Sequence, residues 1–206
     1  MRTPQSTYRL QITSGFTLFD AAERLEALAD LGVDWVYLSP ILQAEPGSDH
    51  GYDVVSHARI DEARGGAEGL DALAQEAQRL GMGVLVDIVP NHMGVATPEH
   101  NSWWWQVLRD GRESPLGDAF DIDWDAGGGK LLLPIVGDND WSEDGTVAHL
   151  SLDRDREALR YWETKLPVAP GTGAGPTWPP RSSCCCPCSA TRGSRWRCGS
   201  SRRAGW

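Results

Sequence analysis

Hydrophobic and polar residues follow two different periods along roughly the first 90 residues of the chain. Residues 7–12 alternate residue by residue and are rich in β-forming side chains, so they predict a strand, and residues 33–38 are expected to form a second strand that ends at Ser39-Pro40. Residues 84–89 form a nearly continuous apolar run, which is typical of a strand covered on both faces. The two segments between these strands have the helical period. The pattern therefore predicts the order strand, helix, strand, helix, strand.

Both predicted helices carry an apolar stripe and end at a glycine. Thr17 can cap the first helix, and the second occupies about residues 67–80. Gly32 and Gly81 supply the C-terminal stops. The stripes consist of Ala22, Leu25, Leu28 and Leu31 in the first helix and of Leu70, Leu73, Ala77 and Leu80 in the second.

Alternating strands and helices with short connections imply a parallel sheet, which a doubly wound fold and a (β/α)8 barrel both satisfy. No glycine-rich phosphate-binding pattern follows the first strand, which counts against a dinucleotide-binding fold. The connections after the second and third strands are long, and residues 41–65 are expected to form a polar loop. Barrel enzymes build their active sites from such loops. We therefore expect an α/β fold in which residues 1–93 are the first three βα units of a (β/α)8 TIM barrel.

Residues 94–175 lose this rhythm and are expected to form a large insertion after the third strand, folded over the barrel mouth. The segment contains consecutive tryptophans at 103–105, a glycine turn at 127–129 and a strand-like stretch at 130–136. Two interpretations of its tryptophans stay open. They either form a lid that closes the site or pack as a small core of the inserted subdomain.

The composition changes sharply near Gly175. Residues 181–206 hold all five cysteines and six of the 19 Lys and Arg residues, but none of the 29 Asp and Glu residues. The cysteines lack the CxxC spacing of a metal site, and a disulfide framework would need an oxidising compartment. We interpret residues 176–206 as an aberrant, disordered tail that arises from translation in a shifted reading frame.

Charge and hydropathy exclude several classes of partner. The formal net charge is −10, and no run rich in Lys or Arg precedes residue 181, which argues against nucleic-acid binding. No segment has the length and hydrophobicity of a signal peptide or a membrane span. We expect a cytoplasmic protein that has no nucleic-acid or membrane partner, no cofactor and no metal site.

Polar side chains gather where the third predicted strand ends. The string Asp87-Ile88-Val89-Pro90-Asn91-His92 places a carboxylate, an amide and an imidazole at the end of a barrel strand, where active sites lie. Taken singly, Asp and Asn fit a turn and a lone histidine is often structural. Together, on one short segment, they favour a binding site.

These residues resemble the first signature region of the α-amylase family. The string Ser48-Asp49-His50-Gly51-Tyr52-Asp53 resembles the segment of that family whose Tyr-Asp pair lines the subsite for the sugar to be cleaved. The resemblance implies that Tyr52 stacks on this glucose and that Asp53 and His92 hydrogen-bond its hydroxyl groups. It implies supporting roles for Asp87, Asn91 and His50.

Within that family, about residues 5–175 are similar to the maltooligosyl trehalose synthases. The strings that carry this likeness are residues 6–11, 37–40, 47–54, 65–70 and 87–94. The likeness implies a glucan 1-α-glucosylmutase that moves the reducing-end α-1,4 linkage of a maltodextrin to α-1,1 by a retaining mechanism. A maltooligosaccharide is then the substrate, and a maltooligosyl trehalose hydrolase is a functionally linked enzyme.

The family's catalytic carboxylates follow later strands, so we expect no catalytic residue in this chain. None of the candidate aspartates in the insertion lies in a matching motif; they are Asp121, Asp123, Asp138 and Asp140. The isolated chain is therefore expected to be inactive on maltodextrins. Two alternatives stay open: an α-glucan hydrolase or sucrose-active transglucosylase of the same family, and a non-catalytic sugar-binding fragment.

Overall fold

The computed structural model describes residues 3–143, 145–153 and 158–169. They belong to the first of the two compact units of the chain, Met1–Gly173. The predicted tail, residues 176–206 with their five cysteines, lies outside the described residues. The interpretation of that tail therefore stays a prediction.

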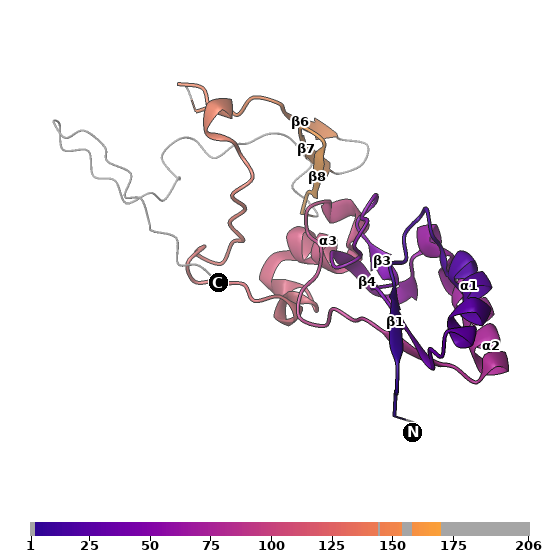
Figure 1. Ribbon diagram of the computed structural model, residues 1–206. Helices are drawn as coiled ribbons and strands as arrows, with labels where there is room; N and C mark the ends of the chain where they lie inside the picture. The colour runs from indigo at the N-terminus through magenta and orange to yellow at the C-terminus, as the bar shows by residue number, and fades with distance from the viewer. Residues whose placement is uncertain (1–2, 144, 154–157, 170–206) are drawn as a thin grey trace, which may run out of the picture. The chain divides into compact units, whose positions relative to one another are not determined.

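A parallel sheet with two helices on one face forms the first part of the fold. Its strands are β1 (Thr7–Leu10), β2 (Trp35–Leu38) and β5 (Gly83–Val86), which pair in the order β1-β2-β5. The crossover helices are α1 (Leu18–Asp30) and α2 (Gly66–Leu80), which pack against each other on the same side of the sheet (Figure 1). The predicted order of strands and helices is confirmed.

The core lies between this sheet and these helices. Its buried members are Leu10, Val36 and Leu38 from the strands and Leu18, Leu25, Leu28, Leu73 and Ala77 from the helices. Gly69 is needed where α2 meets α1, because a Cβ there would lie 3.0 Å from the Cβ of Leu18. The prediction for Leu31 is wrong, since this side chain is 78% exposed. Leu31 caps α1 and so lies past the last turn that packs on the sheet.

The connection at residues 41–65 is not the expected loop. It folds back on itself as the antiparallel strands β3 (Leu42–Ala44) and β4 (Val54–Ile60), followed by a short 3₁₀ helix, η1 (Glu62–Arg64). The polar residues that suggested a loop occupy the exposed positions of β4 and the turn before it, whereas Val54 and Val55 are buried. One apolar pair is too short a pattern to predict a strand.

The third parallel strand is less covered than its apolar sequence suggests. Val86 is 39% exposed and Ile88 is 64% exposed, so the expectation of two covered faces is wrong for the described residues. The reason is that β5 is the last strand of the described sheet and pairs only with β2 there. Its continuous apolar run suits a strand with a neighbour on each side.

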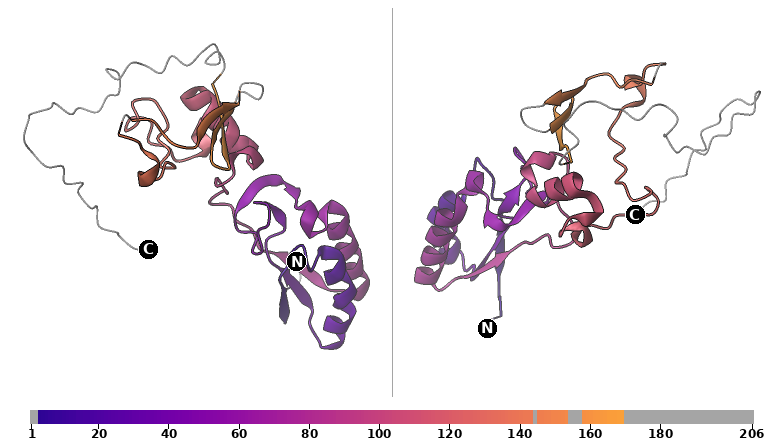
Figure 2. Two further views of the ribbon diagram at one scale, coloured as in Figure 1. Left: turned by 90° about the horizontal axis from the view of Figure 1, so that it is seen from above. Right: turned by 180° about the vertical axis from the view of Figure 1, so that it is seen from behind.

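Beyond residue 94 the chain forms a helix and a second, antiparallel sheet, with short 3₁₀ helices between them. Helix α3 (Ser102–Asp110) begins after Asn101, whose side chain accepts hydrogen bonds from the amides of Trp103 and Trp104. The strands of the antiparallel sheet are β6 (Leu150–Asp153), β7 (Ala158–Tyr161) and β8 (Thr164–Pro167), which form a meander visible in Figure 2. The 3₁₀ helices are η2 (Pro98–His100), η3 (Gly111–Glu113), η4 (Gly117–Ala119) and η5 (Asp138–Asp140).

The strand-like stretch at residues 130–136 is not a strand. Leu132 is 72% exposed, and the segment runs as irregular chain between the glycine turn and η5. The stretch is apolar, but among the described residues it has no neighbouring strand with which to pair, and pairing is what stabilises a β conformation. None of the helices in the described ranges combines the length and the hydrophobicity of a transmembrane segment.

Candidate functional site

Side chains from β1, from β2, from the turn between β3 and β4 and from the segment after β5 meet at one carboxylate oxygen. Oδ2 of Asp87 accepts hydrogen bonds from the Tyr52 hydroxyl at 2.7 Å, the Tyr37 hydroxyl at 3.1 Å and Nη1 of Arg9 at 3.2 Å. The strand register explains this convergence. Arg9 and Tyr37 are directly paired across β1 and β2, and Asp87 comes two residues after Leu85, which pairs with Tyr37. Because side chains alternate along a strand, all of them lie on the face away from the helices.

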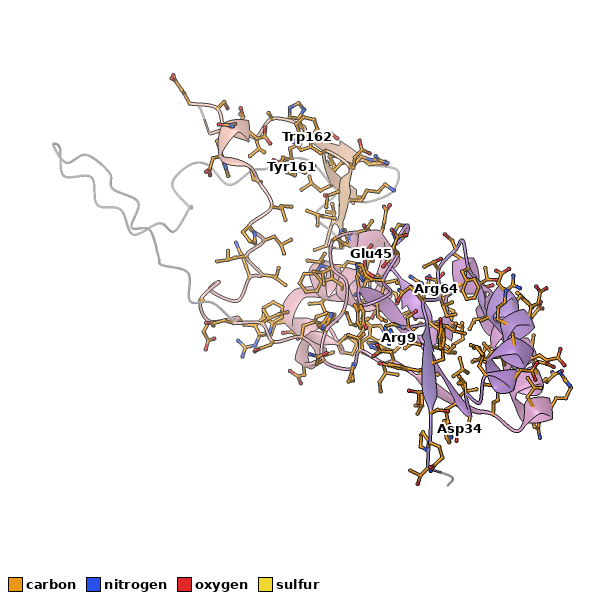
Figure 3. All side chains as sticks on the ribbon, viewed as in Figure 1. Arg9, Asp34, Glu45, Arg64, Tyr161 and Trp162 are labelled. Atoms are coloured by element: carbon orange, nitrogen blue, oxygen red, sulfur yellow. The ribbon has the colours of Figure 1, made fainter. Side chains whose placement is uncertain are left out.

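Arg9 contacts the other three side chains of this network, Asp87, Tyr52 and Tyr37. Its Nη2 donates to the Tyr52 hydroxyl at 3.1 Å, and its guanidinium carbon lies 4.5 Å from the centre of the Tyr37 ring. The arginine thus pairs with the Asp87 carboxylate and also makes a cation–π contact. Arg9 is labelled on β1 in Figure 3. Sequence reasoning missed both Arg9 and Tyr37, although a charged residue in the middle of a predicted barrel strand is a usable signal.

The network sets the protonation states of its members. The hydrogen bond from Tyr52 lowers the pKa of Asp87, desolvation opposes this, and the bonds from Tyr37 and Arg9 lower it further. The same bond to Asp87, together with desolvation, raises the pKa of Tyr52. For Arg9, desolvation lowers the pKa but its hydrogen bonds to Asp87 and Tyr52 outweigh this and raise it. At neutral pH the site therefore holds an ionised carboxylate, a neutral phenol and a guanidinium.

The turn between β3 and β4 carries Tyr52 and Asp53 and is held by its own side chains. The Ser48 hydroxyl donates to Oδ1 of Asp53 at 2.5 Å and accepts from the amide of Gly51 at 3.1 Å. Nδ1 of His50 accepts from the Tyr52 amide at 3.0 Å and lies 3.9 Å from Oδ1 of Asp53. The rings of His50 and Tyr52 stack with their centres 6.0 Å apart. His50 thus fixes the direction of Tyr52.

The segment after β5 reaches this turn through His92 and Gly94. Nε2 of His92 lies 2.9 Å from the carbonyl oxygen of Tyr52, and the amide of Gly94 donates to the Val54 carbonyl at 2.8 Å. The structure therefore brings together five of the six residues predicted from the sequence, namely Tyr52, Asp53, His92, Asp87 and His50. Asn91 is exposed to solvent beside them on the same segment.

A buried arginine, Arg64, supports the turn between β3 and β4. Arg64 is 1% exposed and donates to the carbonyl oxygens of Ile12, after β1, and of Ser48, the latter at 2.6 Å. Its Nε lies 3.6 Å from Oδ2 of Asp61. Gly51 packs against this arginine and adopts φ +77°, and a Cβ there would lie 2.7 Å from the Pro40 carbonyl oxygen. Sequence reasoning missed Arg64 because it placed the residue in a polar loop.

The depressed pKa of Asp87 predicts a specific pH dependence of stability. A carboxyl group whose pKa is lower in the folded state stabilises the fold above its unfolded pKa, about 3.9, and loses that contribution as the pH falls through the folded value. Asp87→Asn is therefore expected to unfold at lower urea concentration than the wild type at pH 7. The difference in urea midpoint between Asp87→Asn and the wild type should shrink below about pH 4. Asp49→Asn, which replaces an exposed carboxylate outside this network, is the control and should unfold close to the wild type at pH 7. A difference for Asp87→Asn that grows in acid would contradict the assignment.

Gly94→Ala tests whether the two site segments must touch. A Cβ at this position would lie 2.7 Å from the Asp53 carbonyl oxygen and 3.1 Å from the Glu45 side chain. Overpacking of this kind destabilises by about 1–3 kcal/mol, so we expect a loss of this size in the free energy of unfolding. Gly15→Ala is the matched control, because a Cβ there makes only an ordinary contact at 3.8 Å. Equal urea midpoints for both variants would show that the contact is dispensable.

The chemistry that this arrangement offers is recognition of a polyhydroxyl ligand. Tyr52 is 38% exposed, the carboxylate of the following residue Asp53 lies near His50, and the His92 imidazole reaches the backbone carbonyl of Tyr52. The Asp87 carboxylate already accepts three hydrogen bonds and pairs with Arg9, so it is suited to anchoring these groups rather than to nucleophilic attack. Within the described ranges, no group of three His, Cys, Asp or Glu side chains is placed to hold a metal ion.

Comparison with known proteins decides the family. Residues 17–142 match the family described as Alpha amylase, catalytic domain. The chain belongs to the α-amylase family. The catalytic domain of this family is a (β/α)8 barrel, and the sheet β1-β2-β5 with α1 and α2 is the N-terminal part of that barrel, as the sequence predicted.

Individual members of the α-amylase family are similar to different shares of the chain. A protein of Mycobacterium tuberculosis assigned as a maltooligosyl trehalose synthase is 48% identical over 82% of this chain and 22% of its own length. The structure of maltooligosyltrehalose synthase from Arthrobacter ramosus is 56% identical over 84% of this chain and 22% of its own, with a TM-score of 0.77. The intracellular maltogenic amylase of Bacillus subtilis is 35% identical over 52% of this chain. The chain thus spans about a fifth of the length of the synthases that it matches.

Proposed function

We propose that the chain is the amino-terminal part of a glucan 1-α-glucosylmutase of the maltooligosyl trehalose synthase type. The observation that carries this proposal is the extent of the likeness. The match to the general α-amylase family ends at residue 142, whereas the synthases resemble this chain over more than four-fifths of its length. The additional matching segment includes the meander β6–β8. The hydrolases that match cover less of the chain than these synthases do and are less identical to it.

The site residues have the following proposed roles. Tyr52 offers its exposed ring to the apolar face of the glucose in the subsite for the sugar to be cleaved, and Asp53 and His92 hydrogen-bond its hydroxyl groups. Asp87 holds Tyr52 in place through the 2.7 Å hydrogen bond. His50 supports Tyr52 from the other side by accepting its amide hydrogen. Asn91 is assigned a supporting position on the segment between Asp87 and His92.

The reaction proposed for the whole enzyme is retaining. A carboxylate attacks the anomeric carbon while an acid protonates the leaving oxygen, which produces a covalent glycosyl-enzyme and a free glucose. That glucose then attacks with its own anomeric hydroxyl, which gives its proton to the now deprotonated acid; the carboxylate leaves, and an α-1,1 linkage replaces the α-1,4 linkage. Residues 1–93 would contribute the glucose-holding side of this site. Residues 94–175 would form the insertion that excludes water, which otherwise hydrolyses the intermediate.

A chimera tests the proposal. Residues 3–169 of this chain replace the equivalent segment of the Arthrobacter ramosus synthase, to which they are 56% identical. We expect the chimera to convert maltopentaose into a non-reducing product without net release of reducing ends. The measurement is reducing-sugar loss combined with mass spectrometry. An increase in reducing ends would identify a hydrolase instead, and an inactive but folded chimera would refute the proposed function.

A further inference from the structure

An exposed tryptophan lies outside the site described above, at the turn between β7 and β8. Trp162 is 55% exposed although one face of its ring is covered by the imidazole of His149, whose centre lies 3.7 Å from that of the indole. The open surface of the indole is therefore its opposite face. Trp162 is labelled beside Tyr161 in Figure 3.

The backbone of His149 and Trp162 has an unfavourable conformation that gains no compensating burial. Among the described residues, His149 and Trp162 are the non-glycine residues with positive φ, at +60° and +53°. This conformation is uncommon for a bulky side chain, and glycine or asparagine would form the same turn more readily. Because the indole remains more than half exposed, its burial does not compensate for the strain. Strain of this kind accumulates at binding sites.

A carboxylate is fixed at the edge of this ring. Oδ2 of Asp140 accepts a hydrogen bond from the Trp162 indole at 3.2 Å and another from the Tyr161 hydroxyl. The Tyr161 oxygen also accepts from the amide of Gly137 at 2.9 Å, which fixes the phenol. No hydrogen bond to Oδ1 of Asp140 comes from the part of the chain that the structure describes. The bond from Tyr161, followed by that from Trp162, lowers the pKa of Asp140, so this carboxylate is ionised at neutral pH.

We propose that Trp162 and Asp140 form a second carbohydrate-binding site, which holds glucose units of an α-1,4-glucan. The apolar face of a pyranose covers the open face of the indole, and its hydroxyl groups donate to Oδ1 of Asp140. The neighbouring side chains Asp138 and Glu163 are also acidic and exposed, which favours a neutral ligand over a phosphorylated one. The choice of a glucan as the ligand rests on the proposed function. The second site shares no residue with the first site around Tyr52 and Asp87.

The test follows the indole hydrogen of Trp162 by NMR in the full 206-residue chain. The signal is assigned with Trp162→Phe, and its position in the wild type reports the bond to Asp140. Addition of maltoheptaose is expected to shift this signal in a saturable manner. Asp140→Asn should weaken the affinity by about tenfold or more, because a charged acceptor is replaced by a neutral one. The matched control Glu163→Gln, on the same turn, should leave the affinity within about twofold.

The outcomes separate this proposal from the proposed function. Tyr52→Ala should leave the response of Trp162 unchanged, whereas it should abolish product formation in the chimera. A Trp162 signal that maltoheptaose does not move, or an Asp140→Asn variant that binds as well as the wild type, would overturn the second site even if the chimera is active. A response to tetramethylammonium as strong as that to maltoheptaose would overturn the carbohydrate assignment. An inactive chimera with an intact Trp162 response would refute the function alone.

Discussion

Replacement of Arg64 by methionine is expected to lower the free energy of unfolding by about 3–5 kcal/mol, the usual effect of breaking a buried charge pair. The side chain is 1% exposed, and it connects three separate segments of the chain. Its guanidinium donates to the carbonyls of Ile12 and Ser48 and lies near the Asp61 carboxylate. Methionine fills a similar volume but leaves two carbonyl oxygens without their donor and the Asp61 carboxylate without its charge partner.

Urea denaturation followed by tryptophan fluorescence measures this loss. Arg79→Met is the matched control, since Arg79 forms a hydrogen-bonded ion pair with Glu76 at 2.6 Å but is exposed on α2. An exposed pair contributes little, so the control midpoint should stay close to that of the wild type. Equal midpoints for the two variants would show that Arg64 does not hold the turn. Because Arg64 contacts Ser48, its loss should also weaken sugar binding at Tyr52.

Asp53→Ala in the chimera is expected to reduce kcat/KM on maltopentaose by about 10- to 150-fold, which corresponds to the loss of one charge-assisted hydrogen bond. The carboxylate lies beside Tyr52 and accepts from the Ser48 hydroxyl at 2.5 Å. Removal of it takes away an acceptor for the glucose hydroxyl groups and leaves the overall fold in place. The measurement is the initial rate of non-reducing product formation over a range of substrate concentrations.

Two further variants distinguish sugar binding from support of the turn. Ser48→Ala removes the partner of Asp53 but keeps the carboxylate, so its effect on kcat/KM should be much smaller than that of Asp53→Ala. Asp49→Ala, on the same turn and exposed, should behave as the unmodified chimera. If Ser48→Ala is as damaging as Asp53→Ala, the role of Asp53 is to shape the turn. That result would remove Asp53 from the proposed binding residues.

Local pattern was enough to predict the parallel sheet and its two helices. Strand and helix patterns are properties of adjacent residues, and both helices are long enough to show their period. The convergence of Tyr52 with His92 also followed from the sequence, because both segments come after strands of one parallel sheet. The carboxyl ends of parallel strands lie at the same edge, so the side chains of these segments had to be near each other.

Tertiary structure alone decided which further side chains join them. Arg9 and Tyr37 reach Asp87 because the strand register places them side by side on the face away from the helices, and the register is a relation between segments. Arg64 is buried because residues far away in sequence supply the carbonyls that it satisfies. The stretch at 130–136 is apolar like a buried strand but pairs with no strand among the described residues. In each case the role of a residue depends on the segment that lies opposite it in the fold. The local sequence of one segment does not specify which other segment that is.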